Sequence, residues 1–113
     1  MPQLNLTVSQ SLTVEKKHDL QLTIGNSMGL LPGKTLDNTI ICIQDGCAMF
    51  KGGKPLDGAF ADIRLFKASP EESKKAFSEK LFAILKDSLG IDPGGVYINF
   101  IELDHWASRG TYQ

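Results

Sequence analysis

Pro2 is the first residue of this sequence whose type and position could do chemistry. It follows Met1 directly and precedes residues 3–8, where polar and apolar residues alternate as in a half-buried strand. Proline donates no backbone hydrogen bond, and the start of a strand is one of the few sheet positions that tolerates it. If Met1 is removed, however, Pro2 becomes a free secondary amine at the end of a rigid element. Such an amine could act as a base or a nucleophile.

Two cysteines form a second candidate group. Cys42 and Cys47 lie in the stretch CIQDGC, and the four residues between them could close a small disulfide loop. A metal site would need further ligands, and His18 and His105 are distant in the sequence. We therefore expect Cys42 to be a buried strand residue and Cys47 a turn residue, both reduced. No metal and no cofactor is expected.

The composition is that of an ordinary globular domain. The 113 residues carry a net charge of −1, with 42% hydrophobic and 22% charged residues, so we expect one domain over residues 1–113. The mixed charges argue against a nucleic-acid partner, which would require a basic patch. No apolar run approaches the length needed to cross a membrane. Without a recognisable signal peptide, we expect a cytoplasmic protein.

The first half of the chain predicts a strand, a helix and a second strand. Thr13 can cap a helix that carries Glu15 in its first turn. Apolar residues three or four apart form the buried stripe of this helix: Leu20, Ile24, Met28 and Leu31. The helix should end at residues 31–34, and the apolar run at residues 39–43 predicts a buried strand.

The second half repeats this order. Residues 59–66 alternate as in a strand, Ser69 and Pro70 predict a capped helix start, and Gly90 is placed to end that helix. Residues 96–103 then form another strand. The chain thus predicts two β-α-β pseudo-repeats, over about residues 1–56 and 57–113.

Right-handed crossovers would place both helices on one face of a four-stranded sheet and leave the other face bare. Apolar residues occur at both odd and even positions of residues 59–66 and 96–103. Because no further helix remains to cover the bare face, we expect other subunits to cover it in a closed, symmetric oligomer.

Taken together, the Met-Pro start, the PGKT stretch after the first helix and the IDPGGVYINF stretch near the end resemble the macrophage migration inhibitory factor family of the tautomerase superfamily. The resemblance implies a homotrimer whose sheets enclose a central core. It also implies keto–enol tautomerisation of small α-keto or enol carboxylates such as phenylpyruvate or dopachrome-like compounds. Some members of the family are secreted cytokines, so secretion without a signal peptide is the alternative to a cytoplasmic location.

The resemblance assigns roles to five residues. Pro2, once Met1 is removed, would be the catalytic base, because an amine in an apolar pocket near a cation loses stability in its charged form. Lys34 matches the lysine that holds the substrate carboxylate, although a solvated lysine at a helix end is the alternative. Tyr97 and Asn99 share one strand face and would act across the subunit boundary. Phe66 falls where the family uses a backbone group beside the proline.

The C-terminal segment DHWASRGTYQ departs from the family pattern. Trp106 or Phe100 could supply the aromatic wall of the pocket, and Arg109 could reach a site in a neighbouring subunit. The Cys-x-x-Cys motif of the family is missing, so thiol-oxidoreductase activity is not expected. Two other functions remain open. One is a catalytically inactive, cytokine-like interaction protein with the same trimeric fold. The other is a decarboxylase or dehalogenase, although the paired arginines of such relatives are represented only by Arg64.

Overall fold

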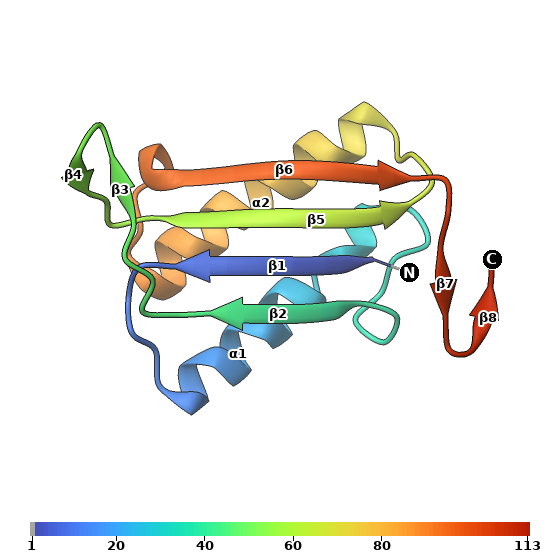
Figure 1. Ribbon diagram of the computed structural model, residues 1–113, viewed down its shortest axis with the longest axis horizontal. Helices are drawn as coiled ribbons and strands as arrows, with labels where there is room; N and C mark the ends of the chain where they lie inside the picture. Colours follow the sequence, from blue (N-terminus) through green and yellow to red (C-terminus); the bar gives the residue numbers. More distant parts are fainter. Residues whose placement is uncertain (1) are drawn as a thin grey trace.

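The computed structural model describes residues 2–113, which fold into one main sheet, two long helices and two short hairpins (Figure 1). In chain order the elements are β1 (Gln3–Val8), α1 (Val14–Gly25), the 3-10 turn η1 (Met28–Leu30), β2 (Ile40–Gln44), β3 (Phe50–Lys51), β4 (Lys54–Pro55), β5 (Ala59–Phe66), α2 (Glu71–Leu89), the 3-10 turn η2 (Pro93–Gly95), β6 (Val96–Leu103), β7 (Ala107–Ser108) and β8 (Thr111–Tyr112).

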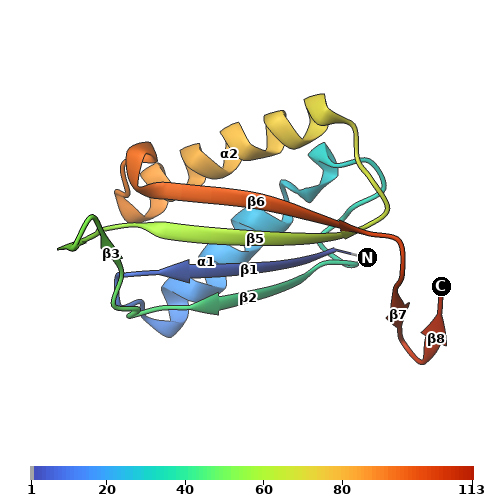
Figure 2. The same cartoon turned by 45° about the horizontal axis from the view of Figure 1, so that its top comes forward.

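Four strands form the main sheet in the order β2-β1-β5-β6. β1 pairs with β2 in parallel, β5 pairs with β6 in parallel, and the central β1–β5 pair is antiparallel. A helix joins the two strands of each parallel pair, and both helices lie on the same face of the sheet (Figure 2). The expected pair of β-α-β units is confirmed.

The hydrophobic core lies between this sheet face and the helices. β1 contributes Leu4, Leu6 and Val8, which alternate with half-buried polar residues, and α2 contributes a buried apolar stripe: Phe77, Leu81, Ile84 and Leu85. This arrangement holds β1 at the centre of the fold. The residue that precedes β1 is therefore attached to a rigid strand.

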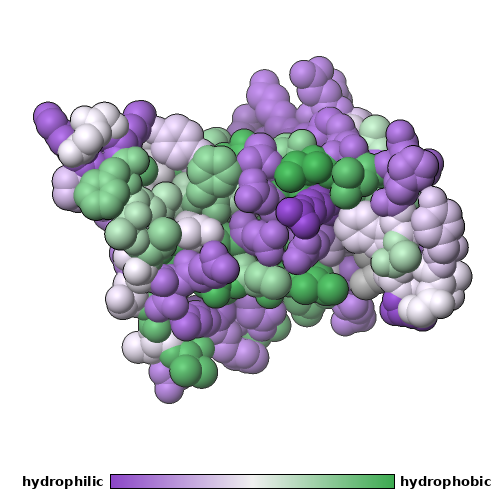
Figure 3. Space-filling view, viewed as in Figure 1, coloured by the Kyte–Doolittle hydropathy of each residue, from purple (hydrophilic) through white to green (hydrophobic). Residues whose placement is uncertain are grey.

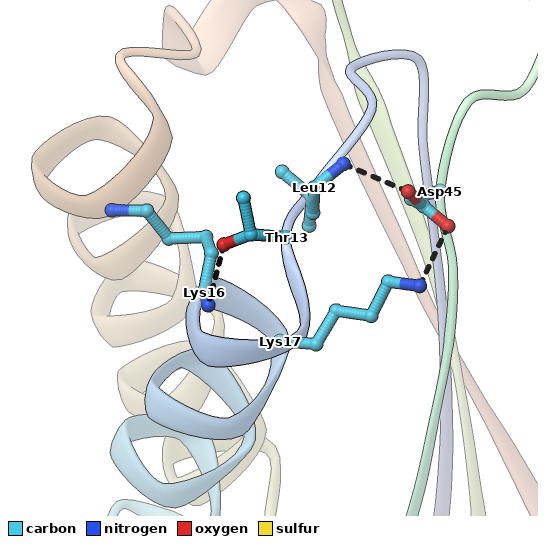
Figure 4. Close-up of polar contacts among 5 residues, drawn as sticks. All are labelled: Leu12, Thr13, Lys16, Lys17 and Asp45. Atoms are coloured by element: carbon cyan, nitrogen blue, oxygen red, sulfur yellow. Dashed lines mark hydrogen bonds and ion pairs between the residues drawn. The ribbon is translucent and has the colours of Figure 1, made fainter.

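The start of α1 is tied to the end of β2 (Figure 4). The Thr13 hydroxyl accepts a hydrogen bond from the Lys16 N–H at 3.1 Å, so the expected cap is confirmed. The Asp45 carboxylate accepts a hydrogen bond from the Leu12 N–H at 2.7 Å and pairs with the Lys17 Nζ at 3.0 Å. The Leu12 N–H first, and Lys17 second, hold the pKa of Asp45 below its usual value. These contacts fix the direction of α1 against the sheet.

Both helices differ from expectation at one end. α1 ends at Gly25, and the chain continues through η1, so Met28 and Leu31 are buried but not helical. Gly25 packs so closely against Leu36 that a Cβ there would collide with it. At the start of α2, Ser69 makes no side-chain cap; Pro70 occupies the cap position. The expected end of α2 at Gly90, which adopts a left-handed conformation (φ +67°), is confirmed.

The expectation of a buried strand at residues 39–43 is wrong in detail. β2 is an edge strand, and only one of its faces meets the helices. Ile41 and Ile43 are half-buried on that face, whereas Ile40 and Cys42 are exposed on the other. Cys42 is thus not a buried residue, and Cys47 is exposed as well; both are free thiols.

The sheet face away from the helices is seen in Figure 3. Hydrophilic side chains occupy much of its middle, and apolar patches lie around them. Period-two alternation places Asn5 of β1 together with Asp62 and Arg64 of β5 on this face. Phe60, Ile101 and Ile40 are its exposed apolar residues toward the ends and edges. The apolar residues expected on this face therefore lie toward its periphery, whereas its centre is polar.

Residues 50–55 form the β3–β4 hairpin, where the sequence had indicated only a connecting segment. Its turn consists of Gly52 and Gly53, both at positive φ, and it projects beyond one end of the main sheet (Figure 1). Within residues 2–113, neither helix is long and apolar enough to cross a membrane. In the same residues, no three potential metal-ligating side chains come together.

Candidate active site

A cavity of about 350 Å³ lies beside Pro2, at the start of β1. Pro2 is buried, and its carbonyl oxygen accepts a hydrogen bond from the Ile40 N–H at 3.1 Å, which extends the β1–β2 pairing by one residue. The cavity is lined by residues of three segments: Pro2, Gln3, Ile40, Trp106, Ala107, Ser108 and Arg109. Met1 lies outside the described residues. Pro2, the candidate base, therefore borders a partly open cavity large enough for a small molecule.

The C-terminal hairpin forms one wall of this cavity. Its two strands pair Ala107 with Tyr112 and Ser108 with Thr111. Arg109 and Gly110 form the turn, at φ +50° and +81°, as in a type I′ turn. The residues that lead into this turn, from Trp106 to Arg109, lie beside the start of β1, whereas residues 110–113 do not line the cavity. Arg109 thus lines a cavity within its own subunit, a possibility that the sequence did not indicate.

An aromatic contact links this wall to the sheet. The centroid of the Trp106 ring lies 6.2 Å from that of Phe66, which is the last residue of β5. Trp106 is also held by a hydrogen bond from the Gln113 N–H to its carbonyl oxygen at 2.8 Å. Phe100 does not take part, because its ring packs edge-to-face against Phe77 of the core, 6.5 Å between centroids. Of the two candidates for an aromatic wall, the structure places Trp106 at the cavity.

Lys34 is half-buried in the loop between η1 and β2, where its N–H donates a hydrogen bond to the Leu31 carbonyl at 3.0 Å. Lys34 does not line the Pro2 cavity. Among the described residues that do line it, Arg109 is the only one with an ionised side chain. The structure therefore brings Pro2, Trp106 and Arg109 together and leaves Lys34 outside this group.

Tyr97 lies at the opposite end of the sheet from Pro2. It pairs with Phe60, which pairs with Thr7, five residues along β1 from Pro2. At 3.4 Å per residue, that separation is roughly 17 Å along the strand. Tyr97 lines a second cavity, of about 290 Å³, with Phe60 and residues of the β3–β4 hairpin. The Lys51 Nζ sits 5.2 Å from the centre of the Tyr97 ring. Tyr97 and Pro2 of one subunit therefore cannot contact the same small molecule.

Asn99 lies between these two ends, on the open face. Its Nδ2 donates a hydrogen bond to the Asp62 carboxylate. Among residues 2–113, the buried Asn99 Oδ1 and the buried Tyr97 hydroxyl have no hydrogen-bond partner. Buried polar atoms rarely stay unpaired in a complete assembly. Tyr97 and Asn99 of β6 thus carry unused hydrogen-bonding capacity on the face opposite the helices.

Comparisons with known proteins identify the fold. Protein-family models and curated proteins give no match to this sequence, whereas solved structures do. Macrophage migration inhibitory factor 2 of Leishmania major superposes with a TM-score of 0.91 at 21% identity, covering 100% of this chain and 97% of that chain. The chain has the fold of the macrophage migration inhibitory factor proteins. The Entamoeba histolytica macrophage migration inhibitory factor-like protein superposes nearly as well, with a TM-score of 0.87 at 22% identity and coverage of 99% and 98%.

Two further solved structures share this fold. Pt0534, described as inactivated by 2-oxo-3-pentynoate, has a TM-score of 0.84 at 16% identity, with coverage of 97% and 95%. A fused 4-OT protein described as an asymmetric trimer has a TM-score of 0.85 at 16% identity, with coverage of 97% and 94%. The resemblance inferred from the sequence is thus confirmed at the level of the fold.

Sequence reasoning missed the participation of Ser108, Ile40 and Gln3 in the Pro2 cavity. A signal was present for Ser108, because a Gly in the second position of a two-residue turn is typical of a β-hairpin. That signal indicates that residues 107–112 form a compact hairpin after the last long strand. Ile40 reaches the cavity through the β1–β2 register, which the sequence does not specify for an edge strand, whereas Gln3 is simply the next residue after Pro2.

Proposed function

We propose that this protein is a keto–enol tautomerase in which Pro2, freed by removal of Met1, is the general base. The observation that carries the proposal is the cavity beside Pro2, which is bordered by Trp106 and Arg109 in a chain with this fold. The proposed substrates are small α-keto or enol carboxylates of the phenylpyruvate or dopachrome type. In support, a protein of the same fold is inactivated by a 2-oxo acid, 2-oxo-3-pentynoate.

The proposed reaction is a balanced proton transfer. In the ketonising direction, the neutral Pro2 nitrogen accepts the proton of the enol hydroxyl, and the resulting Pro2 ammonium delivers a proton to the neighbouring enol carbon as the carbonyl forms. In the reverse direction, the neutral Pro2 nitrogen accepts a proton from the carbon next to the carbonyl, and the ammonium returns a proton to the oxygen. A nearby cation disfavours the protonated amine and so favours a base that is neutral near physiological pH.

The proposal includes a homotrimer whose active sites lie between subunits. The roughly 17 Å between Tyr97 and Pro2 along the sheet means that Tyr97 can join the site only from a neighbouring copy, and the resemblance assigns Asn99 the same role across the subunit boundary. Their unpaired polar atoms would then steady the charge that develops on the enolate oxygen. Phe66 would contribute through its contact with Trp106. Lys34 is assigned to the substrate carboxylate by the resemblance alone.

The test combines intact mass with an assay of phenylpyruvate ketonisation. We expect the mass to show loss of Met1, and Pro2→Gly to lower kcat by about 100-fold or more, the usual contribution of a general base. Pro32→Gly, the same change at an exposed proline outside the cavity, is the matched control and should retain activity. Full activity of Pro2→Gly would refute Pro2 as the base. Correctly processed protein that acts on no such substrate would favour the catalytically inactive interaction protein.

A further inference from the structure

Arg109 is the unexplained residue of the Pro2 cavity. It is exposed, and among the described residues that line the cavity it alone carries an ionised side chain. The ion pairs formed within residues 2–113 involve Lys17, Lys67 and Lys74, and none involves Arg109. The guanidinium group therefore borders the cavity without an anionic partner from its own subunit.

The turn itself does not account for an arginine at this position. Arg109 has φ +50°, in the left-handed region, where asparagine, aspartate or glycine is strongly preferred at the first central position of a type I′ turn. A long side chain there costs conformational energy that those residues would avoid. Residues with strained backbone conformations cluster at functional sites, where the strained conformation contributes to binding or catalysis.

A second polar group lies next to Arg109. The Ser108 hydroxyl oxygen is buried, lines the same cavity and has no hydrogen-bond partner within residues 2–113. An unpaired buried hydroxyl is costly, and most such groups are satisfied by a neighbour or a ligand. A bound anion that accepts from both the guanidinium and the hydroxyl would satisfy both groups.

We propose that Arg109, assisted by the Ser108 hydroxyl, binds the carboxylate of the substrate in the Pro2 cavity. A guanidinium group binds a carboxylate through two parallel hydrogen bonds, with more geometric specificity than a lysine provides. The apolar side chains of Trp106 and Ile40 would then contact the remainder of the ligand. The inference deepens the proposed tautomerase function by assigning its carboxylate-binding residue, and it selects 2-oxo acids over neutral ketones.

Trp106 allows binding to be measured without catalysis. It is the only tryptophan of the chain and lines the same cavity, so its fluorescence reports on occupancy. The probes are 3-phenylpropionate, which is an unreactive carboxylate, and its neutral amide. We expect Arg109→Asn to weaken binding of the carboxylate by about 10- to 100-fold, as for loss of a charge-assisted hydrogen bond, and to leave binding of the amide unchanged.

The asparagine variant separates a binding role from a structural one. Asparagine suits the turn better than arginine, so a purely structural Arg109 would leave carboxylate binding unchanged or improve it. Lys67→Asn is the matched control, because Lys67 is also a cation at positive φ (+69°) but does not line the cavity. It should bind both probes as the unaltered protein does.

Two results would overturn the inference. One is equal affinity of the unaltered protein and Arg109→Asn for 3-phenylpropionate. The other is a loss of carboxylate binding in Lys34→Ala but not in Arg109→Asn, which would assign the carboxylate to Lys34. Both results are binding measurements that do not depend on turnover. They therefore test the role of Arg109 even if Pro2 is not the base. Conversely, a failure of Arg109 leaves the role of Pro2 intact.

Discussion

The C-terminal hairpin positions Trp106, Ser108 and Arg109, so a change confined to its turn should alter binding without unfolding the protein. Gly110 is the residue to change, because it has φ +81° and an added Cβ would meet no atom within 4 Å. Gly110→Ala therefore adds backbone strain and no steric clash. The strain is about 1–2 kcal/mol for an L-residue in the left-handed region.

The hairpin is sensitive to a cost of this size. It contains only two residue pairs, Ala107–Tyr112 and Ser108–Thr111, and isolated two-stranded hairpins are marginally stable. A penalty of about 1–2 kcal/mol changes the ratio of closed to open hairpin by about 5- to 30-fold. Since only the closed hairpin completes the cavity wall, the apparent Kd for 3-phenylpropionate should rise by about 3- to 10-fold. Titration of Trp106 fluorescence measures this directly.

Gly90→Ala is the matched control for the same backbone strain. Gly90 has φ +67°, and an added Cβ there also meets no atom within 4 Å, but it ends α2 far from the cavity-lining residues. We expect Gly90→Ala to lower the Tm by about 4 °C and to leave the Kd unchanged. Gly110→Ala should instead raise the Kd and leave the Tm unchanged. A Gly110→Ala variant with an unchanged Kd would show that the turn does not position the cavity wall.

Three other substitutions test the fold that supports the site. Gly95→Ala should lower the free energy of unfolding by about 1–3 kcal/mol in urea titrations, because its Cβ would lie 2.7 Å from the Asp57 carbonyl oxygen in the loop before β5. Gly29→Ala, whose Cβ would meet no atom closer than 4.0 Å, should cost under about 1 kcal/mol. Lys74 and a backbone N–H lower the pKa of Glu102, so its ionised form stabilises the fold above the unfolded pKa and loses that effect as pH falls through the folded pKa. Glu102→Gln should therefore be less stable than the unaltered protein at pH 7, and this difference should shrink as the pH is lowered; a difference that grows in acid would contradict this assignment. Thr13→Ala should cost about 1 kcal/mol, measured by thermal unfolding, through loss of the α1 cap; an unchanged Tm would contradict a stabilising cap.

The order and type of the main elements follow from local sequence pattern. The strands at residues 59–66 and 96–103 match the expected ranges, because both have strong periodic or β-branched character and flanking turn residues. The sequence placed the end of α1 too late, because Met28 and Leu31 continue the helical spacing. Both side chains are buried, but Met28 lies in the 3-10 turn η1 and Leu31 directly follows it. Spacing reports which residues are buried but not whether the backbone between them stays helical.

The composition of the site depends on contacts between distant segments. Pro2 was identified from its position and from the family resemblance, but its neighbours Ile40 and Trp106 meet it only because of the β1–β2 register and the path of the chain after β6. Similarly, the polar centre of the open face was not foreseen. Asp62 and Arg64 lie within the strand expected at residues 59–66. The pairing of β5 with β1, however, decides which alternate residues of β5 face the helices and which face away.

The antiparallel β1–β5 pair at the centre of the sheet relates the two halves of the chain by an approximate twofold rotation. Gln3 pairs with Ile40 in the first half as Ala59 pairs with Val96 in the second, so Pro2 corresponds to Gly58. Each of the two strand starts has a cavity near it, of about 350 and 290 Å³. The two strand starts are not chemically equivalent, because the Gly58 nitrogen is an amide that donates to the Ser9 hydroxyl at 3.0 Å. Proline could not replace Gly58 without a shift of the backbone, since an added Cβ would lie 2.5 Å from the Gly95 carbonyl oxygen. The twofold relation between the halves therefore repeats the strands and the cavities but not the residue type at the strand start.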